Sequence, residues 1–248
     1  MMINPADVLR IASGEIGYRE DPPGTNKNKF AADLDKNYPE WYYYDGGPHK
    51  KNGYDWCTIF HDWAFIKAYG VETARKLLYR PKENNYGAGV KFAWSYYRGA
   101  GRIAPNPILG CSVFFTSYKD RRYATHIGIC SGVTDTYITV IEGNAGTDSQ
   151  YVVEKQYRRD YSYLYGYGLP EYDTKPVTNY TPGQHYQVVC KDTLNLREAP
   201  DVASRRITAA NPGTIIRCED STVDKKGNTW IKVTAYMCAV EDGHKYIE

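Results

Sequence analysis

CTIFHDWAFIKAY, at residues 57–69, predicts a buried helix. Drawn as a helix, the stretch is apolar over most of its circumference, which is typical of a helix in the core of a domain. Gly70 follows at the position where a helix commonly ends. The irregular sequence NGYDW comes immediately before, so Cys57 is predicted to lie in the first turn of the helix.

Helices are also predicted on both sides of this stretch. Asn4 and Pro5 are typical of an N-cap and a first helical position, and apolar residues at helical spacing follow them. Two further helices are expected at residues 72–79 and 90–97. Residues 21–51 are rich in Pro, Gly, Asn, Lys and aromatic residues, and predict a long irregular segment.

Strand patterns begin after Pro107. Short apolar runs are separated by residues typical of turns, which favours an antiparallel arrangement. The runs are CSVFFTSY (111–118), THIGICSG (125–132), TYITVIEGN (136–144) and residues 163–169. Helices followed by an antiparallel sheet define an α+β domain over residues 1–170.

The remaining sequence predicts a linker and a second, smaller domain. Residues 171–183 contain prolines and small polar residues without apolar periodicity, which is typical of a linker. Residues 184–248 contain the short alternating runs YQVVC, LNLRE, TIIRCE and TWIKVTA. Short strands at this spacing predict a small all-β barrel.

Composition excludes several classes of function. No apolar run reaches about 18 residues, so no membrane span is expected. The net charge is +2 without a concentrated basic block, so no nucleic-acid partner is expected. The chain has 25 tyrosines, whose flat faces and hydroxyls suit saccharide or peptide surfaces. The sequence does not indicate the oligomeric state.

Cys57 is the best candidate nucleophile among the six cysteines. A thiol in the first turn of a helix lies at the positive end of the helix dipole, which favours the reactive thiolate. The free backbone N–H groups of that turn can also stabilise an oxyanion. Cys111, Cys130, Cys190 and Cys218 lie in apolar, strand-like sequence and are expected to be buried and inert.

His126 is the candidate base. In a strand His126, Gly128 and Cys130 share one face, while the intervening isoleucines share the other and point to the core. Glu142 and Asn144 are also two residues apart, and either could lie beside His126 on the next strand. That group would accept the Nδ1–H of His126 and leave Nε2 toward the thiol.

A metal site is the alternative for Cys57. His61 lies four residues further along and would share a helix face with it, but no nearby residues complete a zinc site. His61 is therefore expected to be structural or to line the groove, and Asp62 to be solvated or to cap the helix. Asp33, Asp35 and Glu40 lack the spacing of a calcium loop. We expect no metal and no cofactor.

Residues 8–169 resemble the CHAP family, the cysteine- and histidine-dependent amidohydrolases/peptidases. The matching residues are Tyr54, Trp56 and Cys57 in GYDWC, the run GCSVFF at 110–115, His126 in HIGIC, and Glu142 and Asn144 in IEGN. The resemblance implies a papain-like fold. It also implies that Cys57 is the nucleophile, His126 the base, Glu142 the orienting acid and Asn144 an auxiliary polar group. Tyr54 and Trp56 are expected to line the substrate groove. The chain departs from many relatives at Cys111, where they have Asp.

The tail resembles a bacterial SH3-like domain, which implies attachment to cell-wall peptide or glycan. The matching residues are LNLREAP at 194–200, NPGT at 211–214 and GNTWIKV at 227–233. The closing sequence YMCAVEDGHKYIE departs from the usual last strand of that family.

Together these features predict a peptidoglycan hydrolase that cleaves an amide bond, with bacterial peptidoglycan as its partner. The bond could be the glycan–L-alanine amide or a peptide–peptide bond. The N-terminus predicts a helix and not a secretory signal, so we expect a phage or prophage endolysin, made in the cytoplasm and acting on the wall after release. The alternatives are a non-catalytic wall-binding or virion structural protein, and a cysteine peptidase acting on proteins.

Overall fold

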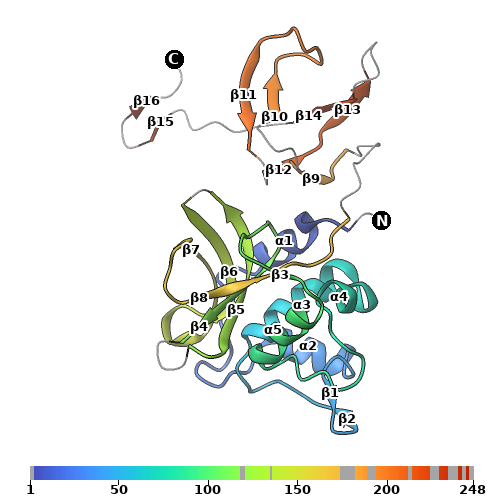
Figure 1. Cartoon of the computed structure of the whole chain (residues 1–248), viewed down its shortest axis with the longest axis vertical. Coiled ribbons are helices and arrows are strands. Elements are labelled where there is room, and N and C mark those ends of the chain that lie inside the picture. Colours follow the sequence, from blue (N-terminus) through green and yellow to red (C-terminus); the bar gives the residue numbers. More distant parts are fainter. Residues whose placement is uncertain are drawn as a thin grey trace. The chain divides into compact units, whose positions relative to one another are not determined.

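The structure is a computed structural model that describes residues 3–117, 121–134, 136–173, 182–188, 194–211, 214–223, 229–233, 240–241 and 244–245. The chain divides into two compact units, Met1–Asp173 and Thr174–Glu248. The first unit contains the helices and a large antiparallel sheet, and the second contains only short strand pairs among its described residues (Figure 1).

The helices of the first unit lie largely where the sequence predicts them. Their bounds are α1 Pro5–Ser13, α2 Lys29–Asn37, α3 Cys57–Tyr69, α4 Val71–Leu77 and α5 Val90–Gly99. The bounds of α3 agree with the predicted helix, and Gly70 ends it with a φ of 78°. The side chains of α3 are buried from Cys57 to Ile66, as its apolar circumference predicts.

Helix α2 corrects the prediction that residues 21–51 are irregular. Asn28 caps the helix, because its side chain accepts a 2.8 Å hydrogen bond from the backbone N–H of Ala31. Phe30 is fully buried and packs on the rings of Phe60 and Trp63 of α3, at centroid distances of 5.0 and 4.8 Å. The helix is thus stabilised by one cap and one apolar face that docks on α3.

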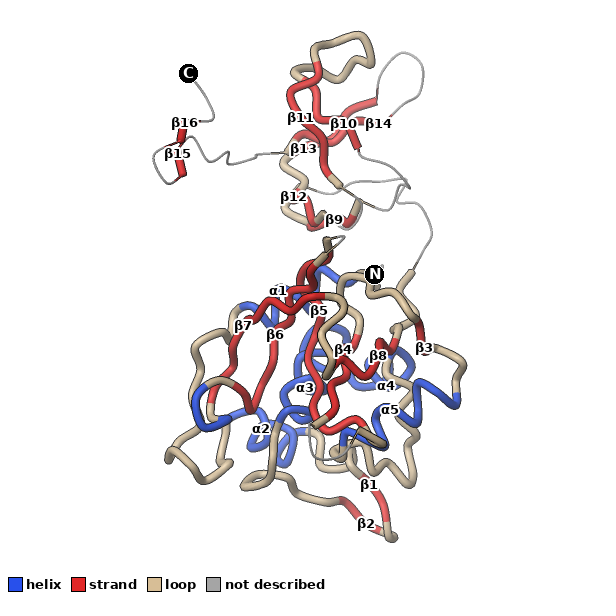
Figure 2. The backbone as a smooth tube through the Cα atoms, turned by 60° about the vertical axis from the view of Figure 1, so that its left-hand side comes forward, coloured by secondary structure: helices blue, strands red, loops and turns tan. Residues whose placement is uncertain are grey.

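The sheet has the strand order β3-β8-β4-β5-β6-β7, and all its pairings are antiparallel. Its strands are β3 Ile103–Ala104, β4 Ser112–Thr116, β5 Ala124–Val133, β6 Tyr137–Ala145, β7 Tyr151–Arg158 and β8 Leu164–Gly168. Strand β7, which the sequence did not predict, forms the edge beside β6 (Figures 1 and 2). A short hairpin, β1 Tyr43–Tyr44 and β2 Gly47–Pro48, lies apart from this sheet.

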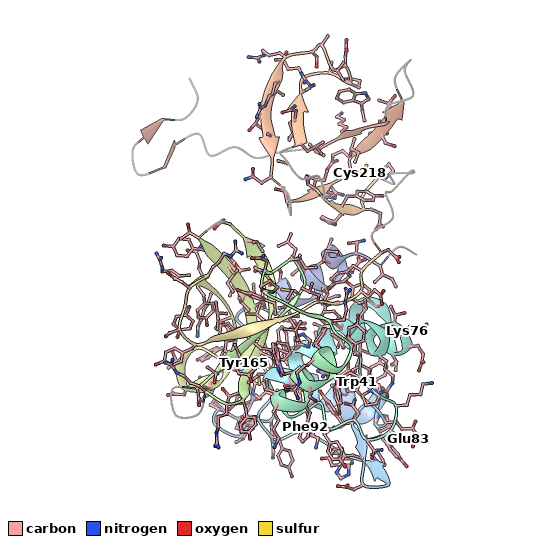
Figure 3. All side chains as sticks on the ribbon, viewed as in Figure 1. Trp41, Lys76, Glu83, Phe92, Tyr165 and Cys218 are labelled. Atoms are coloured by element: carbon pink, nitrogen blue, oxygen red, sulfur yellow. The ribbon has the colours of Figure 1, made fainter. Side chains whose placement is uncertain are left out.

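One face of the sheet packs on the helices. Phe114 of β4 contacts Trp94 and Tyr97 of α5 at centroid distances of 5.1 and 6.0 Å. Its register partner on β5 is Ile127, which therefore points to the same side. Side chains fill the space between sheet and helices, and Trp41 lies among the helices (Figure 3).

The opposite face carries a second apolar cluster, together with His126 and Glu142. Val113, Phe115, Cys130 and Val140 belong to a buried cluster on this side. Phe115 is the register partner of His126, so His126 lies on this face and not on the helix face. The prediction that His126 and the neighbouring isoleucines lie on opposite faces of the strand is therefore confirmed.

Asp62 of α3 corrects the prediction that it is solvated or caps the helix. It is fully buried and accepts hydrogen bonds from Trp41, Tyr42 and Arg80. Arg80 is also fully buried, and its guanidinium lies 2.7 Å from Asp62. Burial opposes ionisation of Asp62, but Arg80 and the hydrogen bond from His61 outweigh it and lower the pKa of Asp62 to about 2.

The second unit contains antiparallel strand pairs. The pairs are β9 His185–Gln187 with β12 Ile215–Arg217, β10 Leu194–Arg197 with β11 Arg206–Ala210, β13 Asp220–Val223 with β14 Thr229–Lys232, and β15 Val240–Glu241 with β16 His244–Lys245. Among the described residues these pairs are separate two-stranded sheets, and none closes into a barrel. Most of the predicted linker, together with Cys190 and Cys238, lies outside the described residues.

The described cysteines other than Cys57 are fully buried, as predicted for Cys111, Cys130 and Cys218. Cys218 belongs to the second unit (Figure 3). No helix in the described part of the chain is long and apolar enough to cross a membrane.

Candidate active site

Cys57 is the first residue of α3 and is 6% exposed. The residue before it, Trp56, occupies the N-cap position, and no side chain caps the helix among the described residues. The backbone N–H groups of the first turn therefore have no partner within the helix and are free of side-chain caps. This arrangement places the thiol beside hydrogen-bond donors that can stabilise a developing negative charge.

His126 of β5 joins the thiol to a carboxylate. Its Nε2 donates a 2.7 Å hydrogen bond to Oε2 of Glu142, and the Cys57 thiol lies near enough to the ring to help raise the pKa of His126. The His126 side chain is 25% exposed, whereas that of Glu142 is 3% exposed. The exposed part of the His126 ring can reach a substrate, while the buried carboxylate of Glu142 holds the ring from the other side. This arrangement suits a catalytic base.

The surroundings of His126 favour its protonated form. Burial opposes the charge, but the hydrogen bonds with Cys57 and Glu142 outweigh it and raise the pKa of His126 from 6.5 to about 10. Because an imidazolium is stabilised by adjacent negative charge, the site favours the charged form of His126.

The orientation of the ring corrects one detail of the prediction. The sequence argument assigned Nδ1 to the orienting acid and Nε2 to the thiol. In the structure Nε2 bonds Glu142, so Nδ1 is the nitrogen left for Cys57. The strand alternation indicates which face a histidine occupies, but the ring orientation depends on where Glu142 lies on the neighbouring strand.

Gly128 permits the close approach of Glu142 to His126. A Cβ atom at Gly128 would lie 2.5 Å from Cγ1 of Val140 and 2.8 Å from Cγ of Glu142. These distances are far inside van der Waals contact. Because Gly128 has no side chain, the Glu142 side chain can extend across this position of β5.

Tyr157 of β7 is a functional candidate that the sequence did not reveal. Its hydroxyl donates a 2.6 Å hydrogen bond to Oε1 of Glu142, so both carboxylate oxygens are engaged. Burial and the nearby Glu142 raise the pKa of Tyr157, which keeps the phenol protonated and able to donate. Tyr157 was not identified from the sequence because its strand, β7, was not predicted.

Asn144 departs from the predicted geometry. Its φ is 53°, and a register shift interrupts the pairing of β6 with β7 between Glu142 and Ala145. The strand does not persist regularly from Glu142 to Asn144, so alternation cannot place the two on one face. The Oδ1 atom of Asn144 is buried without a hydrogen-bond partner among the described residues. An auxiliary role for Asn144 stays a prediction.

The two residues predicted to line the substrate groove have opposite environments. Tyr54 is 65% exposed and is accessible to a ligand. Trp56 is fully buried, and its indole N–H donates a 2.9 Å hydrogen bond to Glu20. A side chain without exposed surface cannot contact a substrate, so the assignment of Trp56 to the groove is wrong.

His61 is structural. Its Nδ1 lies 3.0 Å from Asp62 and its Nε2 lies 2.7 Å from the hydroxyl of Ser112, so both ring nitrogens are engaged. Burial lowers the pKa of His61 and favours the neutral ring. Neither nitrogen is free to bind a metal with Cys57. Among the described residues, no group of three or more His, Cys, Asp or Glu side chains could hold a metal ion.

A groove opens beside the His126–Glu142 pair and encloses about 450 Å³. Its lining residues come from β4, β5, β6, β7 and the segment that leads into β8. They are Phe115, Thr116, His126, Glu142, Tyr157, Tyr161 and Tyr163. A substrate in this groove would meet the candidate base directly.

Residues 49–144 match the CHAP domain family. The matched segment contains Cys57, His126, Glu142 and Asn144, so the similarity to this family extends over the site described above. An α+β unit with a multistranded antiparallel sheet fits this family.

Two solved structures of one protein are similar to the chain. "The crystal structure of Ly7917" has 14% sequence identity and a TM-score of 0.39, and the match covers 92% of this chain and 86% of that one. "The crystal structure of Ly7917 with the hydrolyzing product of MDP" has 13% identity and a TM-score of 0.41, with coverages of 98% and 97%. TM-scores this low do not establish a common fold. The comparison with curated proteins gives no match.

Proposed function

We propose that the chain is a peptidoglycan hydrolase that cleaves an amide bond with Cys57 as its nucleophile. The observation that carries the proposal is the hydrogen bond from His126 to the buried Glu142, together with the effect of the nearby Cys57 in raising the pKa of His126. The CHAP domain match over the same residues supports peptidoglycan as the substrate class.

The geometry supports nucleophilic catalysis in two stages. The Cys57 thiolate attacks the amide carbonyl, and the oxyanion that forms accepts hydrogen bonds from the backbone N–H groups at the start of α3. The His126 imidazolium then gives its proton to the leaving amine as the C–N bond breaks. Water, deprotonated by His126, attacks the resulting thioester and releases the acid and the Cys57 thiol.

Glu142 has the role of orienting acid in this proposal. Its carboxylate fixes the ring through Nε2 and stabilises the positive charge on His126, without itself taking a proton. The low exposure of Glu142 strengthens that interaction, because charges attract more strongly away from water.

The tail and the biological setting are further parts of the proposal. Residues 171–183 form a linker, and residues 184–248 form an SH3-like domain that binds the cell wall. Antiparallel strand pairs in the second unit support this assignment. The chain acts as a phage or prophage endolysin that reaches the wall after release from the cytoplasm. A fluorescent fusion of residues 184–248 should bind purified walls, and a fusion that stays in solution would contradict this assignment.

The central test is the turbidity of a purified cell-wall suspension. Wild-type protein should clear the suspension, and folded Cys57→Ala protein should not. Casein with the same proteins controls for a general peptidase. If Cys57→Ala clears walls at the wild-type rate, the nucleophile is wrongly assigned. If casein is cleaved and walls are not, the protein is a peptidase that acts on proteins.

A further inference from the structure

A row of aromatic rings forms one wall of the groove beside His126. Phe115 packs on Tyr157 at a centroid distance of 4.9 Å, Tyr157 on Tyr161 at 5.3 Å, and Tyr161 on Tyr163 at 5.4 Å. We call these four residues the aromatic row. Tyr161 is 39% exposed, although large apolar surfaces are usually covered in a folded protein. The row therefore offers ring surface to a ligand beside the candidate base His126.

The groove is nearly neutral toward a ligand. Among the described residues that line it, the charged groups are His126 and Glu142, and these two pair with each other. Arg121 lies 5.2 Å from the ring of Tyr163 but is not part of the lining. A site for a peptide carboxylate would be expected to present an arginine or lysine to it. The groove instead suits an uncharged ring.

A pyranose ring has this chemistry. Its axial C–H bonds form a flat, weakly positive face that fits the negative face of a tyrosine ring, while tyrosine hydroxyls can bond its hydroxyl and N-acetyl groups. On the basis of the proposed function, we infer that the aromatic row binds an N-acetylated sugar of the wall glycan.

This placement selects the bond that is cleaved. His126 belongs to the groove lining, so a sugar on the aromatic row lies next to the group that would protonate the leaving amine. In peptidoglycan the amide adjacent to a sugar joins the lactyl group of the muramoyl residue to L-alanine. Cys57 would therefore form a thioester with the lactyl carbonyl and expel the L-alanine amine, which leaves with the proton of His126. Water then replaces the sulfur, which restores the thiol and yields the free lactyl carboxylate.

Binding of a peptide-free disaccharide tests the sugar site. The probe is N-acetylglucosaminyl-N-acetylmuramic acid, titrated by NMR into the full-length Cys57→Ala protein. The matched control for Tyr161→Ala is Tyr137→Ala, because Tyr137 is 37% exposed. Tyr137 pairs with Arg158, one position away from the Ile138–Tyr157 pair, so it lies on the other face of the sheet.

Tyr161→Ala should raise the dissociation constant by roughly 2- to 10-fold, as loss of one stacked ring predicts. Tyr137→Ala should leave it unchanged, and Tyr161→Phe should keep most of the affinity because the ring remains. Any sugar bound by the tail contributes equally to all these proteins. No binding at millimolar disaccharide, or equal effects of Tyr161→Ala and Tyr137→Ala, would overturn the inference.

Mass spectrometry of wall digests tests the bond separately. The wild-type enzyme should release stem peptides with a free L-alanine amine, and glycan strands with lactyl carboxylates. Cleavage only between amino acids would overturn the inference while leaving the proposed function intact. If walls are not cleaved at all, the proposed function fails, and the disaccharide titration alone decides whether the aromatic row is a sugar site.

Discussion

The Tyr157 hydroxyl donates a 2.6 Å hydrogen bond to the carboxylate of Glu142, whose other oxygen holds His126. The edge strand β7 is thereby connected to the candidate base through one carboxylate. Tyr157 does not lie in the matched CHAP segment, which ends at residue 144. Its contribution is to fix the carboxylate, so we regard it as a positioning residue.

Removal of this hydroxyl should weaken catalysis without affecting the fold. We expect Tyr157→Phe to lower kcat by about tenfold, because a hydrogen bond to a charged group contributes about 1.5 kcal/mol or more. The ring and its packing on Phe115 remain. The acid and base limbs of the pH–rate profile should also shift, since Glu142 is then held by His126 alone. Tyr137→Phe is the matched control, and an equal effect of both variants would contradict a positioning role.

Glu142→Gln should have a larger effect. The amide keeps the size of the carboxylate but loses its charge, so the imidazolium loses a stabilising partner. We expect kcat/KM to fall by about 100-fold or more, and the pKa of His126, followed by NMR, to fall from about 10. Glu154→Gln is the control, because Glu154 is an exposed acid on β7. If the kinetics of Glu142→Gln matched the wild type, Asn144 would become the candidate for the orienting role.

The raised pKa of His126 predicts how stability depends on pH. A group with a raised pKa binds its proton more tightly in the folded state. Its contribution to the free energy of unfolding is therefore fully present below the unfolded pKa of 6.5. That contribution is lost as pH rises toward the folded pKa of about 10. As pH rises from 6.5 to about 10, the urea midpoint of the wild type should therefore decrease more than the midpoint of His126→Gln. Parallel curves would show that His126 is not protonated preferentially in the folded protein.

Cys57 should be the first of the described cysteines to be alkylated. Cys111, Cys130 and Cys218 are fully buried, and burial raises the pKa of Cys111 and Cys218. Only thiolate reacts rapidly with iodoacetamide, and Cys57 has an imidazolium partner. Peptide mass spectrometry should find Cys57 labelled first and activity lost in parallel. His126→Ala should slow the labelling of Cys57. Inactivation by a zinc-selective chelator, reversed by zinc, would contradict thiolate chemistry.

Asp62 should be essential for stability and not for chemistry. Asp62→Asn leaves the buried Arg80 without its counter-ion, and breaking a buried pair typically costs about 3–5 kcal/mol. Because the pKa of Asp62 is lowered from 3.8 to about 2, its contribution to the free energy of unfolding is present above pH 3.8. That contribution is lost as pH falls through about 2. Denaturant unfolding of Asp62→Asn measures the effect. Asp160→Asn, which alters an exposed ion pair, should change the midpoint little.

Local patterns in the sequence predicted much of the first unit. The apolar circumference of residues 57–69 predicted α3. Strand alternation predicted that His126 lies on the face opposite Ile127. These features depend on neighbouring residues only. Helix α2 was missed because its short apolar face, formed by Phe30, Ala31 and Leu34, is hidden among turn-forming residues. Strand β7 was missed because an exposed edge strand carries several charged residues.

The errors at the site involve contacts between residues distant in sequence. Trp56 is buried because it bonds Glu20, and Asp62 because it meets Arg80. Neither partner can be identified from spacing along the chain. The orientation of the His126 ring likewise depends on the position of Glu142 along the adjacent strand. Alternation specifies the face of each residue but does not exclude a shift of two residues along the strand.

Gly128 has a consequence for engineering this protein. The site needs an empty volume at that position, because even a methyl group would collide with Val140 and Glu142. A library built to change the range of bacteria that the enzyme attacks should therefore leave codon 128 constant. Exposed positions away from the groove, such as Tyr137, can be diversified, since they carry no part of the site.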